Sequence, residues 1–420
     1  MLRPVGTPSL PPDRAIYVPY VRGGRADIRC PVAFATAAGQ NRFMSQDNLA
    51  SAKYMMLGPH PAHESYSITK YFEFYRGNLP ARLGVNVAAR HPGPEGERGT
   101  ILPRQSRART LAENYIQWPA TLMGLTADCF HIVDQGLLWY AAFLKGGRRL
   151  GTVHDLTAYL SVHSRLPLGN RRSRQRLLVW ENTRELLKLD HIVSVSRYTA
   201  DCVVKELGYP ASRITVIPNH LDPLFQCLSE ERRALARRKW FGEVEKVVIH
   251  VGRPLVYKNR IGVIRAFALL RKKLPGARLF LINGALTPDE ADTIRTESLE
   301  GLANVIPPVE TADLVDIYNA ADALAFPSYF EGFGWPPIEA MACGCPVVSS
   351  TRASLREVVG DAALTVENPD DHALISAHLY EVLSVPNTAS DLRARGLSRA
   401  KQFSPSLAVE ALADVYRELS

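Results

Sequence analysis

The sequence predicts an α/β protein of two domains, each built on a doubly wound, mostly parallel sheet. Its 420 residues exceed the roughly 250–300 at which one hydrophobic core stops growing. Short apolar segments of strand length alternate with helix-length amphipathic segments in two blocks, separated by a polar, charged stretch. We therefore expect domains at 1–222 and 246–405, joined by a linker at 223–245. A terminal helix at 406–420 either extends the second domain or crosses back onto the first.

The first block is irregular before it becomes periodic. Residues 18–25 predict a strand that runs into a Gly-Gly turn, and residues 86–110, rich in Pro, Gly and Arg, predict a mobile loop. Regular alternation begins at residue 129. Strands are expected at 129–133, 149–154, 191–195 and 214–217, and helices at 137–144, 177–187 and 200–207.

The second block alternates throughout. Strands are expected at 247–251, 278–282, 304–306, 323–326, 346–349 and 363–366. Helices are expected at 261–273, 288–299, 311–321, 336–343 and 354–359. Pro336 and Pro337 suit a first helical turn, where the missing N–H groups cost nothing, and Gly344 suits the position just beyond a helix end.

The formal net charge of +8 favours anionic partners: nucleotide sugars, lipid phosphates, acidic glycans and nucleic acids all fit. No recognised nucleic-acid-binding module is present, so we expect no nucleic-acid partner. Residues 165–176 contain no acid. They form either a solvated face or a docking surface for anionic lipid or acceptor, with the arginines Arg165, Arg171, Arg172, Arg174 and Arg176.

The sequence predicts a cytoplasmic protein. Its six cysteines lack metal-ligand spacing, as expected for reduced thiols, and its N-terminus lacks the apolar core of a signal peptide. No run reaches the roughly 18–20 apolar residues that span a bilayer. Any membrane association would be peripheral, on the inner face of the plasma membrane.

The richest candidate site follows the strand expected at 323–326. In open α/β sheets ligands bind beyond the carboxyl ends of the strands. Here the turn Glu331-Gly332-Phe333-Gly334 leads into a helix, and its glycines let backbone N–H groups approach a ligand. A glycine turn that feeds a helix N-terminus is suited to a diphosphate.

One glutamate lies in this turn and another on the helix that follows it. Glu339 sits among apolar residues of the helix and is expected to be buried, where the two hydroxyls of a ribose could satisfy it. The alternative is that Glu339 caps a backbone group or pairs with an arginine. Glu331, in the turn, could equally face water.

Cations follow the strand expected at 247–251. Arg253 and Lys258 would face the helix N-terminus across a cleft and clamp a leaving diphosphate. Taken singly, each could be a solvated loop charge; their joint position with the glutamates favours the clamp. In the first block, His154 lies at a strand end, where a catalytic and a structural role are equally open.

These segments resemble the retaining glycosyltransferases of family 4, which have the GT-B fold of two Rossmann-like domains facing each other across a deep cleft. The resemblance extends over residues 129–420. Its motifs are GRPLVYKN, PSYFEGFGWPPIEAMACGCPVV, SLREVVGDAALTV, TVHDL, and VSVSRYTA with ITVIPNHLD.

The resemblance implies that the first domain holds the acceptor and the second holds a UDP-, GDP- or ADP-linked sugar. Glu339 would bind the ribose, and Arg253 and Lys258 the diphosphate. Glu331 would contact the sugar, and His154 would reach it from the opposite wall. The remaining implied contacts are the turn residues Gly332, Phe333 and Gly334, the base-contacting loop around Val309, and a first-domain glycine loop at Gly23-Gly24.

One departure from the family pattern is His220, where members commonly have glycine. A side chain there disfavours positive φ and puts the hinge geometry in doubt. The family analogy implies retention of configuration. No Asp-x-Asp occurs in the chain, so we expect cationic side chains in place of a metal, and no cofactor beyond the donor.

Three other functions remain open. A sugar-nucleotide epimerase or a phosphorylase could share the fold, and a non-catalytic subunit could bind a sugar nucleotide or a glycan. A Rossmann dehydrogenase is disfavoured because no Gly-x-Gly-x-x-Gly follows a strand.

Overall fold

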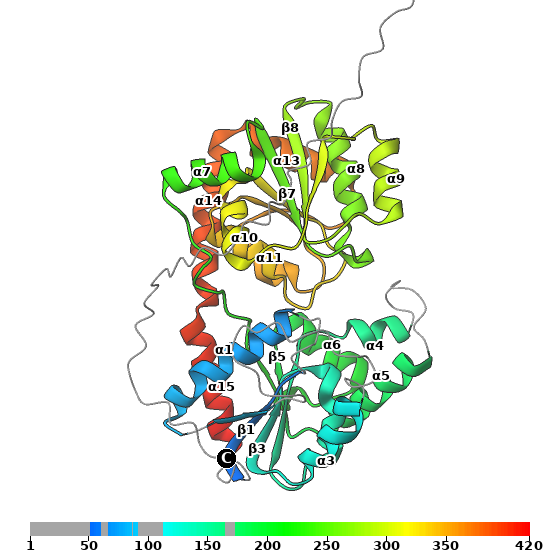
Figure 1. Cartoon of the computed structure of the whole chain (residues 1–420), viewed down its shortest axis with the longest axis vertical. Helices are drawn as coiled ribbons and strands as arrows, with labels where there is room; N and C mark the ends of the chain where they lie inside the picture. Colours follow the sequence, from blue (N-terminus) through cyan, green and yellow to red (C-terminus); the bar gives the residue numbers. More distant parts are fainter. Residues whose placement is uncertain (1–50, 60–65, 86, 91–111, 164–172) are drawn as a thin grey trace, which may run out of the picture. The chain divides into compact units, whose positions relative to one another are not determined.

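The computed structural model describes residues 51–59, 66–85, 87–90, 112–163 and 173–420. Those from residue 51 onward belong to one compact unit. They form two six-stranded sheets, each parallel throughout, with helices in the connections (Figure 1). The predicted α/β class with two doubly wound parallel sheets is confirmed.

The first sheet has the strand order β2-β1-β3-β4-β5-β6. Its strands are β1 (Ser51–Leu57), β2 (Val87–Arg90), β3 (Thr126–Ile132), β4 (Arg148–Val153), β5 (His191–Ser194) and β6 (Ile214–Val216). The chain reverses its direction of progression after β2, because β3 pairs with the other edge of β1. Such a reversal is the point at which doubly wound sheets open toward a ligand.

The helical segments around the first sheet are mostly short. They are α1 (Tyr66–Leu83), the π-helix η2 (Glu113–Gln117), α3 (Trp118–Leu122), the 3₁₀ helix η3 (Gln135–Phe143), α4 (Thr157–Val162), α5 (Ser173–Leu186), α6 (Arg197–Leu207) and the 3₁₀ helix η4 (Ala211–Arg213). The helix predicted at 137–144 is therefore a 3₁₀ helix, and it begins at the N-cap Asp134, whose side chain accepts from Gly136 N.

The early part of the chain is more regular than its sequence suggests. β1, α1 and β2 all precede residue 91, and β2 lies inside the segment predicted to be a loop. β2 has only four residues at a sheet edge, too short for a period of two to stand out. The strand and Gly-Gly turn predicted at 18–25 lie outside the described residues.

The second sheet has the order β12-β11-β10-β7-β8-β9. Its strands are β7 (Lys246–Val251), β8 (Ala277–Ile282), β9 (Ala303–Ile306), β10 (Ala323–Phe326), β11 (Val347–Ser350) and β12 (Leu364–Val366). All six agree with the predicted strands to within a residue or two. β7 and β10 are neighbours, so the loops that follow them meet at the same edge of the sheet.

Helices lie between and after these strands. They are α7 (Glu230–Phe241), η5 (Val256–Lys258), α8 (Arg260–Arg271), α9 (Pro288–Thr296), α10 (Thr311–Ala320), α11 (Trp335–Ala342), α12 (Leu355–Val359), α13 (His372–Ser384), α14 (Pro386–Ala400), η6 (Lys401–Phe403) and α15 (Pro405–Glu418). The polar segment 223–245 contains α7, which Ser229 caps and which packs against α10. This helix was not predicted because most of its side chains face water, so its charged sequence resembles that of a linker.

The last helix, α15, contributes to the core of the first sheet. Leu412 and Tyr416 are buried in one cluster with Tyr54 and Tyr71, and α15 runs beside α1 (Figure 1). Apolar residues recur every three to four positions along α15 and form one face of the helix, which another element must cover. Its partners come from the start of the described chain.

Candidate functional site

The candidate site begins with an ion pair between the loops after β7 and β10. Lys258 ends η5, and its Nζ donates to both carboxylate oxygens of Glu331, at 2.7 and 2.9 Å. Both side chains are largely buried. A pair this poorly hydrated needs good geometry to offset its desolvation, and the two-oxygen contact supplies it. The structure thus brings together two of the predicted site residues.

Aromatic rings line the base of this pair. Lys258 Nζ lies 5.2 Å from the ring centroid of Phe326, at the end of β10, and 5.6 Å from that of Tyr257. Rings at this distance attract a cation through their electron-rich faces. The backbone also joins the two loops, because Tyr329 N donates to Tyr257 O at 2.8 Å. The position of the ammonium is therefore set by packing as well as by Glu331.

The turn 331–334 is held from beneath by Ser354, a buried residue just before α12. Ser354 Oγ lies 2.8 Å from the backbone oxygens of both Glu331 and Phe333. Gly334 has φ 109°, a conformation that strongly favours glycine, and it directly precedes α11. Phe333 is buried against the aromatic core. The predicted turn and helix start are both present.

Gly332 brings the turn against the first sheet. A Cβ at position 332 would overlap the backbone oxygen of His154, which follows β4. Thr199, in the first turn of α6, also donates to Gly332 O at 3.3 Å. Glycine is required at 332 because the two backbones approach each other this closely. His154 and the turn, predicted separately, are therefore adjacent.

The imidazole of His154 is fixed on two sides. Its Nε2 lies 2.9 Å from the carbonyl oxygen of Val133, which can only accept, so Nε2 carries the proton and Nδ1 is left as an acceptor in the neutral ring. Tyr71 packs edge-on against the ring, with centroids 4.9 Å apart. The backbone N–H of His154 donates to Gln135 Oε1 at 2.9 Å. The ring and the backbone of His154 are therefore both held in one position.

Glu339 lies on α11, eight positions after Glu331, and is partly buried. Tyr318 Oη donates to its Oε2 at 3.0 Å. Burial raises the pKa of the Glu339 carboxyl to about 7, and the positive charge of Lys70 acts in the opposite direction. Among the described residues, the partner of this carboxylate is thus a tyrosine, neither an arginine nor a backbone group. Within the described part of the chain, the other carboxylate oxygen has no hydrogen-bond donor, so it could accept from a group such as a ribose hydroxyl.

Arg253 and Val309 are the least constrained of the predicted residues. Arg253 is exposed in the loop after β7. Val309 is half-buried and packs against the core of the second sheet. Neither contacts the Lys258–Glu331 pair in the part of the chain that the structure describes. Gly23-Gly24 and most of the basic run 165–176 lie outside the described residues; Arg176 is exposed on α5.

Several residues of the site were missed by the sequence analysis. Tyr318 contacts Glu339, and Ser354 contacts the turn 331–334. Both residue types are common in buried helices and loops, so their presence in the sequence does not mark a site. Lys70 lies on α1. Its Nζ donates to Thr311 Oγ1 at 3.2 Å and lies 3.7 Å from Asp222 Oδ2. Only Ser354 had a usable signal, since it opens the motif SLREVVGDAALTV.

A further unpredicted contact joins α12 to α6. The carboxylate of Glu357 accepts from the backbone N–H groups of Arg197 and Tyr198, at 3.0 and 2.9 Å. A carboxylate at a helix N-terminus is stabilised by the helix dipole and by the free N–H groups there. Glu357 thus joins α12 to α6, and α12 is preceded by Ser354, which supports the turn 331–334.

The doubt about His220 is removed. Its φ is not among the positive values, so no left-handed conformation is needed at this position. Its ring instead stacks on Phe74, with centroids 3.3 Å apart and planes inclined by 17°. Burial lowers the pKa of His220 to about 4. The departure from glycine is accommodated by packing on α1.

Comparison with known proteins decides the family. The model "Glycosyltransferase Family 4" matches residues 75–223, and the model "Glycosyl transferases group 1" matches residues 232–399. The chain belongs to the family 4 glycosyltransferases. The family predicted from the motifs is confirmed, and the match extends well before residue 129, where the resemblance was weak.

Two of the curated relatives of this glycosyltransferase illustrate the likeness, and both come from bacteria. The chain is 29% identical over 260 residues to O-antigen chain mannosyltransferase B of Escherichia coli, covering 61% of this chain and 67% of that protein. It is 32% identical over 229 residues to D-inositol 3-phosphate glycosyltransferase of Kineococcus radiotolerans, covering 50% of this chain and 53% of that one. The chain thus spans about half to two thirds of the length of these relatives.

Solved structures confirm the GT-B fold. Sucrose-phosphate synthase from Thermosynechococcus elongatus superposes with a TM-score of 0.69 at 19% identity, over 87% of this chain and 99% of that one. Anabaena HepE in complex with UDP-glucose gives 0.66 at 17% identity, over 87% and 99%. WaaG, a glycosyltransferase involved in lipopolysaccharide biosynthesis, gives 0.65 at 16%, over 86% and 98%. At these identities the likeness concerns the fold.

Proposed function

We propose that this chain is a retaining glycosyltransferase that transfers a hexose-type sugar from a nucleotide-sugar donor to a glycan, lipid-linked or small-molecule acceptor. The observation that carries the proposal is the Lys258–Glu331 pair at the meeting point of the β7 and β10 loops, beside the start of α11. The boundaries proposed from the sequence assign the donor to residues 246–405 and the acceptor to residues 1–222.

The donor would be held by complementary charges. Its diphosphate would replace part of the Lys258–Glu331 contact and would also attract the exposed Arg253 from the same loop. The amides of Phe333 and Gly334, at the α11 N-terminus, would donate to phosphate oxygens. Glu339 would accept from the ribose hydroxyls, Glu331 from the sugar hydroxyls, and Val309 would contact the base.

Bond cleavage places positive charge on the anomeric carbon and negative charge on the departing diphosphate. Lys258 would stabilise the diphosphate with little rearrangement, because it is already held in a position largely shielded from water, and the backbone amides and Arg253 would add to this stabilisation. His154 would offer the Nδ1 lone pair to the sugar from the other wall. Attack from the same face, with a phosphate oxygen accepting the acceptor proton, retains the configuration.

The relatives support a donor and an acceptor class. HepE was crystallised with UDP and with UDP-glucose, and the Escherichia coli relative is named as an O-antigen chain mannosyltransferase. These names support the proposal that this chain acts in bacterial polysaccharide or glycoconjugate assembly, with UDP-, GDP- and ADP-linked sugars as the donors to test.

The decisive assay supplies the full chain with each donor class and with glycan, lipid-linked or small-molecule acceptors. It follows release of the nucleoside diphosphate. Product anomers are then assigned by NMR. An α-linked product from an α-linked donor supports the proposal; inversion of the linkage contradicts it. Sugar 1-phosphate formed with inorganic phosphate would instead indicate a phosphorylase, and an epimerised donor would indicate an epimerase. Tight donor binding without turnover for any acceptor would indicate a binding subunit.

A further inference from the structure

The outward face of α5 carries large apolar side chains. Leu177 is 60% exposed and Trp180 is 55% exposed, and Leu187, just beyond the helix, is also exposed. Together with Arg184, these residues are spaced by three, four and three positions, so they form one stripe along the helix. A stripe of this kind normally packs against another element or a partner.

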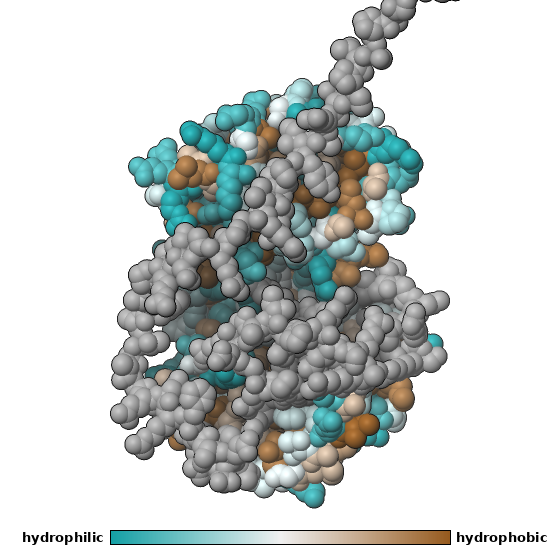
Figure 2. Space-filling model, viewed as in Figure 1, coloured by the Kyte–Doolittle hydropathy of each residue, from teal (hydrophilic) through white to brown (hydrophobic). Residues whose placement is uncertain are grey.

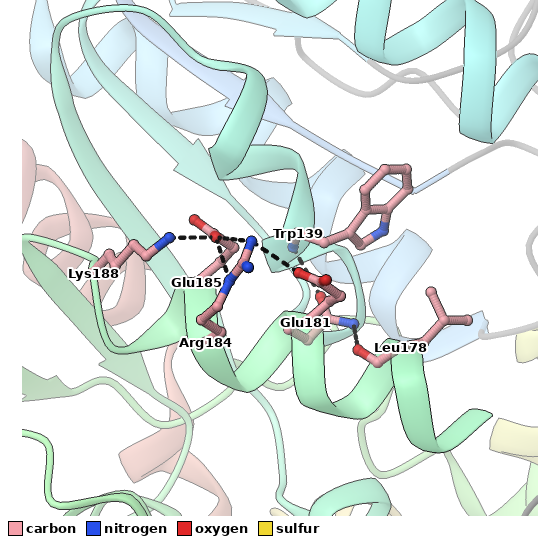
Figure 3. A network of polar contacts seen from close by, with 7 residues as sticks. Trp139, Leu178, Glu181, Arg184, Glu185 and Lys188 are labelled. Carbon is pink, nitrogen blue, oxygen red and sulfur yellow. Dashed lines mark hydrogen bonds and ion pairs between the residues drawn. The ribbon is translucent and has the colours of Figure 1, made fainter. Parts of the chain in front are cut away.

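The charges beside this stripe are arranged to leave a positive excess. The Arg184 guanidinium lies 5.2 Å from the centroid of the Trp180 ring. It also pairs with Glu181 at 3.0 Å, and both Arg184 and Lys188 pair with Glu185 (Figure 3). The two acids of α5 are thus neutralised within the helix surface. From Ser173 to Lys188 the sequence has four cations and two acids.

Neighbouring elements add to the apolar surface. Trp139 N, on η3, donates to Asn182 Oδ1 of α5 at 2.9 Å, so η3 lies directly against the helix. Tyr115 of η2 stacks on Trp139, with centroids 5.2 Å apart, and the next residue, Ile116, is 69% exposed. Hydrophobic residues also reach the surface in Figure 2 in the region where Figure 1 labels α3, the helix that follows η2.

The combination favours a lipid surface over a protein partner. Tryptophan and leucine insert among lipid headgroups, while arginine extends from an apolar stem to phosphate groups. A protein interface would tolerate either net charge, whereas an excess of cations matches anionic lipid. No helix in the described part of the chain is long and apolar enough to cross a bilayer, so the contact would lie in the plane of the headgroups.

We propose that this face, defined as Leu177, Trp180, Arg184 and Leu187 of α5 and its extension, docks on a bilayer that contains anionic phospholipid. The proposal goes beyond sugar transfer and does not depend on it. It also differs from a purely electrostatic contact through the basic run, because it assigns most of the binding to the apolar stripe.

Vesicle flotation tests this directly with the full chain and no donor or acceptor. Vesicles of phosphatidylcholine with phosphatidylglycerol are compared with vesicles of phosphatidylcholine alone. Wild-type protein is expected to bind the anionic vesicles, more weakly at high salt. The double variant Leu177→Ser, Trp180→Ser is expected to bind them at least roughly tenfold more weakly, since it removes most of the inserted apolar area.

A matched control variant tests whether the loss of vesicle binding is specific to this face or follows from making any exposed apolar residue polar. Leu235→Ser changes a residue of α7 that is 64% exposed, and it is expected to leave vesicle binding unchanged. Thermal unfolding of all variants checks that each is folded. Absence of wild-type binding to anionic vesicles, equal binding by the double variant, or an equal loss in Leu235→Ser would each overturn the proposal. A wild-type protein that binds both vesicle types alike would overturn the role of anionic lipid.

Discussion

Lys258 Nζ contacts both carboxylate oxygens of Glu331, at 2.7 and 2.9 Å, across the gap between two loops 73 positions apart. The pair holds the Lys258 ammonium at the edge of the second sheet, next to the turn 331–334 and the start of α11. A polyanionic ligand can share this cation because an ammonium has three donors and Glu331 uses two contacts. The same two residues can therefore hold the two loops together and, in the proposed function, contact the donor.

Donor affinity should rise with pH through the ionisation of Glu339. The pKa of this carboxyl is raised to about 7 by burial, so the ionised form that accepts ribose hydroxyls increases as the pH passes through that value. Calorimetric titration with the nucleoside diphosphate should show tighter binding at pH 8 than at pH 6 (roughly one unit on either side of the midpoint). Glu339→Gln should weaken binding at least roughly tenfold and remove the carboxyl's share of the pH dependence. A Glu339→Gln protein with wild-type affinity would contradict the ribose assignment.

The same group predicts the sign of a stability change. A carboxyl with a raised pKa binds its proton more tightly in the folded state than in the unfolded chain. The free energy of unfolding should therefore fall as the pH rises from the unfolded value of 4.5 through about 7, and this fall should be smaller in Glu339→Gln. Urea titrations of both proteins across this range measure the difference. If the free energy of unfolding changed with pH in the same way in both proteins, burial of Glu339 would not raise its pKa as described.

Gly332→Ala should disrupt the contact between the turn and the first sheet. The added Cβ would overlap the His154 backbone oxygen, so one of the two backbones must move, at a cost of about 1–3 kcal/mol. Transfer activity is expected to drop at least roughly tenfold, because substrate-positioning groups shift. Gly77→Ala is the control: position 77 is open, lies in α1 and has no positive φ. It should raise stability by about 0.5–1 kcal/mol and leave activity intact. Full activity in Gly332→Ala would refute the account of this contact.

Ser354→Ala should destabilise the turn from beneath. It leaves the backbone oxygens of Glu331 and Phe333 without their hydroxyl partner, which costs about 1–3 kcal/mol for a buried group. Unfolding by denaturant should show this loss, and the KM for the donor should increase. The exposed Ser390, whose Oγ donates to Asn387 O, provides the matched Ser390→Ala variant, with an expected change below about 0.5 kcal/mol. Equal effects at the two positions would count against a specific role for Ser354.

The second sheet was the most predictable part of the chain. Its strands are apolar runs bounded by turns, and a parallel sheet buried on both faces produces this pattern directly. The first sheet was harder, because β1 and β2 are separated by a long helix and lie among segments rich in Pro and Gly. Helix α7 was missed because its charged residues gave no apolar stripe.

The site residues were predictable where their chemistry is tied to strand ends. Glu331, Glu339 and Lys258 stand out by type and spacing, and the structure places Lys258 against Glu331. Side chains that act through tertiary contact, such as Tyr318 and Lys70, carry no local signal, since their roles depend on which helices pack together. The 3₁₀ form of η3, which packs against α5, was likewise not predicted, because the apolar pattern of 137–144 does not separate a 3₁₀ helix from an α-helix.

The kinetics of Lys258→Ala test the central claim, that a fixed cation at this edge stabilises the departing diphosphate. The value of kcat/KM for transfer is expected to fall at least tenfold, about 1.4 kcal/mol of transition-state stabilisation, with and without EDTA. Lys272→Ala, at an exposed lysine just beyond α8, should match the wild type. Wild-type kinetics in Lys258→Ala, or activity abolished by EDTA and restored by a divalent cation, would contradict the account.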